Sequence, residues 1–150
     1  MERIDFYHLQ DQSLDAVLPK LLEKAYETKK NIKLKVGNAE RVEFVNSLLW
    51  TYSDTAFIPH GSAKDGNASL QPVFVSADDE NPNGAEFLFL VDGALVDMET
   101  LKGFRRVFNI FDGTSAEALE QARSFWKSLK DEEGELNYWQ FKSGAWVKSA

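Results

Sequence analysis

With 150 residues, the chain has the length of one domain built around a single hydrophobic core. It contains no cysteine, which excludes disulfides, zinc–cysteine sites, iron–sulfur clusters and a thiol nucleophile. The formal net charge of −7 argues against binding to duplex DNA, because a duplex binder needs a cationic surface. A local basic patch on an acidic protein stays compatible with this charge.

The first residues of the chain do not have the pattern of a signal peptide. Residues 1–5 lack a basic segment followed by an apolar one, and no apolar run in the chain approaches the length of a membrane span. The sequence therefore predicts a soluble, cytoplasmic protein that does not contact a membrane.

The first half of the chain alternates between strand and helix patterns. The predicted elements are a strand at 4–7, a helix at 14–25, a half-buried strand at 32–36, a helix at 38–50 and a short extended segment at 57–61. Pro19 either kinks the first helix or marks where its regular hydrogen bonding begins. Asn38 is expected to cap the second helix, and residues 61–69 are expected to form a polar loop.

Three apolar runs follow and predict strands at 73–75, 87–91 and 107–111. The last two runs are largely continuous and each ends in Asp-Gly, which is typical of parallel strands covered on both faces and followed by a turn. Thr114 and Glu117 have the spacing of a capping box and are expected to open a helix through about Lys130. Alternating aromatic residues after Leu136 predict a terminal strand or hairpin.

This order of elements predicts an α/β protein, a single three-layer domain over residues 1–150 with a mostly parallel central sheet. The order of the strands stays open at this level.

The chain carries no recognisable nucleotide-hydrolysis motif. Gly61 and Gly66 have the glycine spacing of a P-loop, but Asn67 and Ala68 stand where that motif requires Lys and Ser or Thr. The segment also precedes a strand instead of opening a helix, so no helix dipole would support phosphate binding. Lys64 is the one cation inside this loop.

Metal-dependent and triad chemistry also lack a signature. His8 and His60 are far apart in the sequence and have no ligand spacing, and no Gly-x-Ser-x-Gly elbow occurs. The sequence therefore predicts no catalytic residues, no metal site and no cofactor.

Two stripes run along the predicted helix after residue 114. The apolar stripe contains Leu119, Ala122, Trp126 and Leu129, and the basic stripe contains Arg123, Lys127 and Lys130. In one interpretation the indole belongs to the core and the cations are solvated near the helix C-terminus. In the other, the helix lines a groove for an acidic peptide with an apolar anchor, because the planar guanidinium of Arg123 suits a carboxylate.

A second group of large apolar residues lies near the middle of the chain. It consists of Trp50, Tyr52, Phe57, Ile58 and Pro59. These residues either cover an edge of the core or form an exposed anchor patch for a partner, since Trp and Tyr are enriched at interface hot spots.

Several segments taken together carry a resemblance to a known family. They are 6–9, Trp50 with 57–61, 71–73, 106–108, 111–113, Ala122-Arg123-x-x-Trp126-Lys127, and Gly134-x-Leu136-x-Tyr138-Trp139 with Trp146. In order and spacing they resemble the chi subunit family of bacterial DNA polymerase III over essentially the whole chain. The resemblance implies a fold related to nucleotide-binding domains but lacking a P-loop.

The resemblance also implies a function without catalysis. Members of the family bind the psi subunit, which tethers them to the clamp loader, and the acidic, phenylalanine-ended C-terminal tail of single-stranded DNA-binding protein. Some also partner a helicase, and DNA is contacted only indirectly.

Carried over by position, the resemblance assigns tail binding to Arg123, with Trp126, Lys127 and Lys130 beside it. Leu119 stands where some members have a further basic residue, so weaker tail binding is expected. It assigns contact with the psi subunit, or an equivalent clamp-loader component, to the segment of Trp50, Phe57, Ile58 and Pro59.

Two other functions remain open from the residues themselves. One is direct binding of single-stranded nucleic acid by aromatic stacking and basic side chains, which the net charge disfavours. The other is a degenerate nucleotide-binding domain, which the missing P-loop lysine disfavours.

Overall fold

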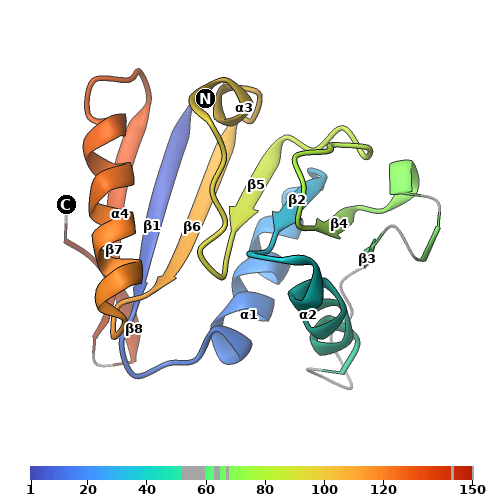
Figure 1. Ribbon diagram of the computed structural model, residues 1–150, viewed down its shortest axis with the longest axis horizontal. Coiled ribbons are helices and arrows are strands. Elements are labelled where there is room, and N and C mark those ends of the chain that lie inside the picture. The colour runs from blue at the N-terminus through green and yellow to red at the C-terminus, as the bar shows by residue number, and fades with distance from the viewer. Residues whose placement is uncertain (52–59, 63–64, 67, 143, 150) are drawn as a thin grey trace.

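An eight-stranded sheet forms the middle layer of the protein in a computed structural model that describes residues 1–51, 60–62, 65–66, 68–142 and 144–149 (Figure 1). The strands are β1 (Arg3–Leu9), β2 (Ile32–Lys35), β3 (His60–Ser62), β4 (Val73–Ser76), β5 (Phe87–Leu90), β6 (Arg106–Asp112), β7 (Glu135–Lys142) and β8 (Ala145–Lys148). The helices are α1 (Leu14–Tyr26), α2 (Ala39–Thr51), α3 (Met98–Lys102) and α4 (Ala116–Leu129), with a 3-10 turn at Ala68–Leu70.

The strand order is β3-β4-β2-β5-β6-β1-β7-β8. Every neighbouring pair is parallel except the hairpin of β7 and β8. Because parallel strands run in one direction, their carboxyl ends lie along one edge of the sheet, at the bottom of Figure 1. The predicted α/β class and mostly parallel sheet are confirmed.

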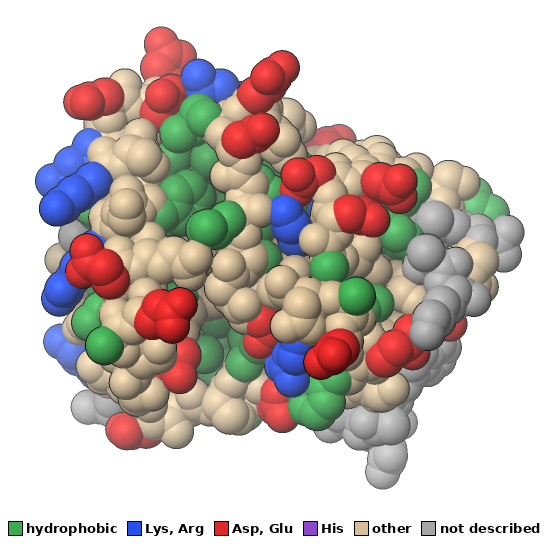
Figure 2. All heavy atoms as spheres, viewed as in Figure 1, with side chains coloured by type: hydrophobic (Ala, Val, Ile, Leu, Met, Phe, Trp, Pro, Cys, Tyr) green, Lys and Arg blue, Asp and Glu red, His purple; other side chains and the backbone are tan. Residues whose placement is uncertain are grey.

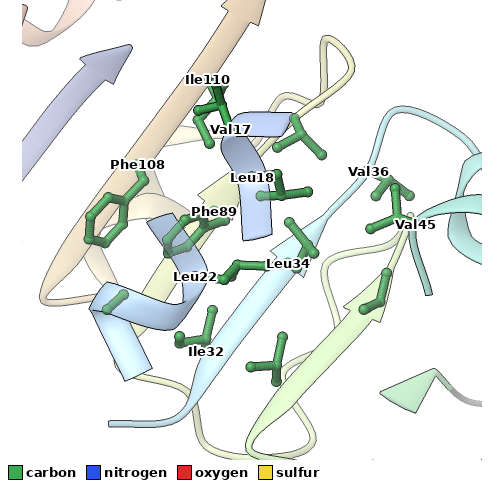
Figure 3. Close-up of a cluster of buried hydrophobic side chains, with 14 of the residues drawn as sticks. Val17, Leu18, Leu22, Ile32, Leu34, Val36, Val45, Phe89, Phe108 and Ile110 are labelled. Atoms are coloured by element: carbon green, nitrogen blue, oxygen red, sulfur yellow. The ribbon is translucent and has the colours of Figure 1, made fainter. Parts of the chain in front are cut away.

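Helices cover both faces of the sheet, which gives the predicted three layers. On one face, α1 and α2 pack on inward-facing residues such as Leu34, Phe89 and Phe108 (Figure 3). On the other face, α3 and α4 pack on residues that include Phe6 and Leu88. Side chains alternate between the two faces of a strand, so the continuous apolar runs of β5 and β6 supply both cores.

The ends of α1 and α2 follow the capping chemistry expected of them. Ser13 caps α1, since its side chain accepts a hydrogen bond from the backbone N–H of Ala16, and Pro19 lies inside this helix. The side chain of Asn38 accepts a hydrogen bond from the N–H of Arg41, as predicted for the cap of α2. The Asp-Gly turn after β5 has positive φ angles at both residues.

The interpretation of residues 32–36 as a half-buried strand is wrong. Lys33 is only 2% exposed, because β2 lies in the interior of the sheet between β4 and β5. Its ammonium group donates hydrogen bonds to Ser76 Oγ and, at 2.6 Å, to the carbonyl of Glu80. These partners compensate for the loss of water and let a lysine occupy an interior strand.

Two smaller predictions are also corrected, and one helix was not predicted. The residue that caps the start of α4 is Ser115, and the hydroxyl of Thr114 donates a hydrogen bond to the carboxylate of Asp112 instead. Edge strand β3 covers residues 60–62, so it agrees with the extended segment predicted at 57–61 in residues 60 and 61, whereas Ser62 lies in the predicted loop. The short helix α3, capped by Asp97, was not predicted because its five residues show no helical periodicity. Within the described residues, no helix is long and apolar enough to span a membrane.

Candidate peptide-binding site on α4

Helix α4 lies on the sheet with one apolar side against the core. Ala122 and Leu129 are buried, and Leu119, Phe125 and Trp126 are half-buried against the same cluster. The helix follows β6 in the chain and leads into β7, so it crosses the sheet near β1 and β7. The predicted apolar stripe is confirmed, and Phe125 widens it.

The basic stripe of α4 faces solvent. Arg123, Lys127 and Lys130 are all exposed, and none of them takes part in an ion pair with another residue that the structure describes. Figure 2 shows basic side chains along the left margin of the molecule, where α4 and β7 lie in Figure 1. We call these three residues the basic row. Their charges are available to a ligand, because no carboxylate of the described residues lies within ion-pair distance of them.

Trp126 connects the basic row to the core. Its ring makes edge-to-face contacts with Phe6, at a centroid distance of 5.3 Å, and with Tyr138, at 5.6 Å. The side chain is half-buried, so one part of the indole packs on the sheet and another part remains accessible. The structure therefore combines the two interpretations of this residue, as core and as surface.

Tyr138 on β7 is the neighbour that the sequence analysis missed. Burial raises the pKa of its phenol, and the positive charge of Arg123 opposes that rise. The phenol oxygen lies 2.7 Å from Nδ1 of His8 on β1. Burial also lowers the pKa of His8, an effect that Asp112 opposes. Tyr138 is thus held in place beside Arg123 and Trp126.

The comparisons with known proteins agree with this architecture. The family model of the DNA polymerase III chi subunit, HolC, matches residues 1–137. A probable DNA polymerase III subunit chi of Rickettsia prowazekii (strain Madrid E) is 30% identical over 117 residues, which cover 75% of this chain and 71% of the relative. The chain belongs to the DNA polymerase III chi subunit family.

Members of the chi family are accessory, non-catalytic subunits of the polymerase holoenzyme. The resemblance inferred from the sequence is therefore confirmed. The matched range of 1–137 contains all of α4, including the basic row, and ends one residue before Tyr138.

The second set of predicted site residues lies mostly outside the described residues. Trp50 belongs to the last turn of α2, but its side chain is not described, and Phe57, Ile58 and Pro59 lie outside the described residues altogether. On the described part of α2, Phe44 is 46% exposed and packs against the guanidinium of Arg41. This helix thus presents an aromatic ring to solvent.

The crevice between β2 and β5, of a kind in which many α/β proteins bind nucleotides, is closed. Such crevices form where two neighbouring strands send their helices to opposite faces, as β2 does with α2 and β5 with α3. At that point Gly37 approaches the backbone of Asp92 so closely that a Cβ would lie 2.2 Å from its carbonyl oxygen. Arg41 also forms an ion pair of 2.9 Å with Asp92 across this crevice.

The two histidines do not form a metal site. His8 contacts Tyr138, and Nε2 of His60 lies 3.1 Å from the carbonyl oxygen of Asn46. In the part of the chain that the structure describes, no group of three His, Asp or Glu side chains is arranged to hold a metal ion.

Proposed function

We propose that this chi-family protein binds the acidic C-terminal tail of single-stranded DNA-binding protein on α4 and links it to the clamp loader. The proposal rests on one observation: the three cations of the basic row are exposed beside a partly accessible indole, and none of them forms an ion pair within the described part of the chain. In this arrangement Arg123 takes the terminal carboxylate, and Lys127 and Lys130 attract the acidic residues that precede it.

The apolar end of the tail has a matching surface in the same place. A terminal phenylalanine ring packs against Trp126, whose contacts with Phe6 and Tyr138 already fix its orientation. An indole held in this way loses little freedom on binding, which favours affinity. The tail itself must become ordered, so we expect a dissociation constant in the micromolar range, which corresponds to a binding free energy of about −8 kcal/mol.

The experiment is a calorimetric titration of the full chain with a peptide that ends in Asp-Phe, with a free or an amidated terminus. Amidation is expected to weaken binding at least about tenfold, because a charge-assisted hydrogen bond contributes roughly 1.5–3 kcal/mol. Raising the salt concentration weakens binding as well, since exposed charges are screened.

Arg123→Ala and Lys127→Ala test the residues of the site. The matched control is Lys20→Ala, because Lys20 is an exposed lysine on α1, on the opposite face of the sheet. Weaker binding by the two α4 variants and unchanged binding by the control support the proposal. Equal affinity of all three would overturn it.

Titration with an oligonucleotide of thymidines separates this proposal from direct nucleic-acid binding. Tighter binding of the oligonucleotide than of the tail peptide, lost in Arg123→Ala, would favour the alternative function.

The link to the clamp loader is the second part of the proposal. We assign contact with the psi subunit, or an equivalent component, to Trp50, Phe57, Ile58 and Pro59, and the exposed ring of Phe44 on α2 is a further apolar group available to a protein partner. Phe57→Ala should lose the clamp-loader partner in co-purification and keep the tail peptide. Retention of both partners would contradict the two-surface arrangement.

A further inference from the structure

A pocket of about 660 Å³ lies on the other side of α4, at the carboxyl ends of β1, β5 and β6. Its walls are the segment 10–14 after β1, the turn 92–95 after β5 and the first half of α4. Ala118, Gln121, Ala122 and Phe125 line it from the helix. These positions point away from the basic row, because 3.6 residues per turn separate the two sets by about half a turn.

All charged side chains that line this pocket are acidic: Asp11, Asp92, Asp112 and Glu117. Arg41 neutralises Asp92, whereas the other three carboxylates have no cation of the described residues in ion-pair contact. Helices α1 and α4 also begin at this pocket, and the N-terminus of each contributes roughly half a positive charge. Three carboxylates outweigh about one positive charge, so the pocket favours a cation and repels phosphate.

The floor of the pocket is apolar. It contains Leu9, Ile110, Phe111 and Phe125, and Leu95 at its margin is 51% exposed. In Figure 2 this region is a hollow in the lower left part of the view, with hydrophobic side chains inside and acidic ones around it. A ligand that fills it therefore needs an apolar group as well as a positive charge.

One buried polar atom in the wall also lacks a partner. The side-chain oxygen of Gln12 is inaccessible to solvent and accepts no hydrogen bond from any described residue. An acceptor left without a hydrogen bond in this way is costly.

We propose that this acidic pocket binds a short segment of a partner protein in which a lysine or arginine stands beside an apolar side chain. The carboxylates of Asp11 and Glu117 pair with the cation, and the apolar side chain packs on Leu95 and Phe125. Helix α4 then has two peptide-binding sides of opposite charge. This proposal does not depend on tail binding at the basic row.

The test is an NMR titration of the ¹⁵N-labelled full chain with the peptide acetyl-Lys-Leu-Lys-amide. Backbone amides of 10–14, 92–95 and 116–122 should shift, with saturation below about 5 mM. The charge-reversed peptide acetyl-Glu-Leu-Glu-amide should leave them unchanged. Equal shifts with both peptides, or none with the cationic one at this concentration, would overturn the proposal.

Glu117→Gln and Glu120→Gln form a matched pair, since both are exposed carboxylates on α4 and only Glu117 lines the pocket. Glu117→Gln should raise the dissociation constant of the cationic peptide about two- to fivefold, the range for an exposed ion pair, and Glu120→Gln should not. Equal effects of the two variants would contradict the assignment. Lysine amide alone is expected to bind much more weakly, and equal affinity would point to a small amine instead of a protein segment.

Discussion

The phenol oxygen of Tyr138 lies 2.7 Å from Nδ1 of His8, and this contact joins β7 to the neighbouring strand β1. The two residues are 130 positions apart in the chain. They meet because β7 pairs in parallel with β1, with Phe6 directly opposite Tyr138. The contact holds the phenol ring against Trp126 and near Arg123, and so it helps to shape the candidate tail site.

Tyr138→Phe removes this hydrogen bond and keeps the ring. The free energy of unfolding should fall by about 1 kcal/mol, a typical value for one hydrogen bond, as measured by urea denaturation. Affinity for the tail peptide should stay within about twofold, since the aromatic wall remains. Tyr138→Ala removes the aromatic ring as well and should lower the affinity for the tail peptide. Equal affinity of the two variants would show that the ring does not contribute to the site.

His8 should make stability depend on pH. Burial lowers the pKa of His8 below its ordinary value of 6.5 in the folded protein. Between that lowered pKa and 6.5 the unfolded chain binds more protons, so stability is fully present above pH 6.5 and falls as the pH decreases through this window. In His8→Gln the loss of stability that His8 causes below pH 6.5 should be absent. Urea denaturation of both proteins at several pH values measures this difference. Parallel curves for the two proteins would contradict the prediction.

Asp5 should be among the residues most important for stability. Its carboxylate is fully buried and accepts hydrogen bonds from Asn137 and Trp139, as well as from Arg3 and Arg106. Asp5→Ala leaves these donors without their acceptor and should cost about 3–5 kcal/mol of unfolding free energy.

The control for Asp5 is Glu135→Ala. Glu135 also pairs with Arg3, at 3.4 Å, but its side chain is 58% exposed. An exposed ion pair of this kind contributes at most about 1 kcal/mol. Similar losses for the two variants would contradict the central role of the buried carboxylate.

Gly37→Ala tests the close approach of backbone at the crevice between β2 and β5. A Cβ at Gly37 would lie 2.2 Å from the carbonyl oxygen of Asp92, so the backbone must shift, and a loss of roughly 1–3 kcal/mol is expected. Gly103→Ala is the milder comparison, because its nearest contact would be 3.2 Å. Thermal unfolding of both variants measures the difference, and an unchanged melting temperature for Gly37→Ala would contradict the closed crevice.

The elements with a clear pattern of apolar residues were predicted from the sequence alone. The continuous runs of β5 and β6 predicted buried parallel strands, and the spacing within α4 predicted both its apolar side and its basic row. The burial of Lys33 was not predictable in this way, because alternation with lysine is also the pattern of a strand with one solvated face.

The sequence by itself determined which residues share a side of α4, since helical periodicity is a local property of the backbone. Only the tertiary structure decided that Tyr138 and His8 stand beside that helix, that Lys33 is interior, and that Asp11 and Glu117 line one pocket. These relationships follow from the order of the strands in the sheet. That order depends on the packing of segments distant in the chain, and no short-range pattern of residues specifies it.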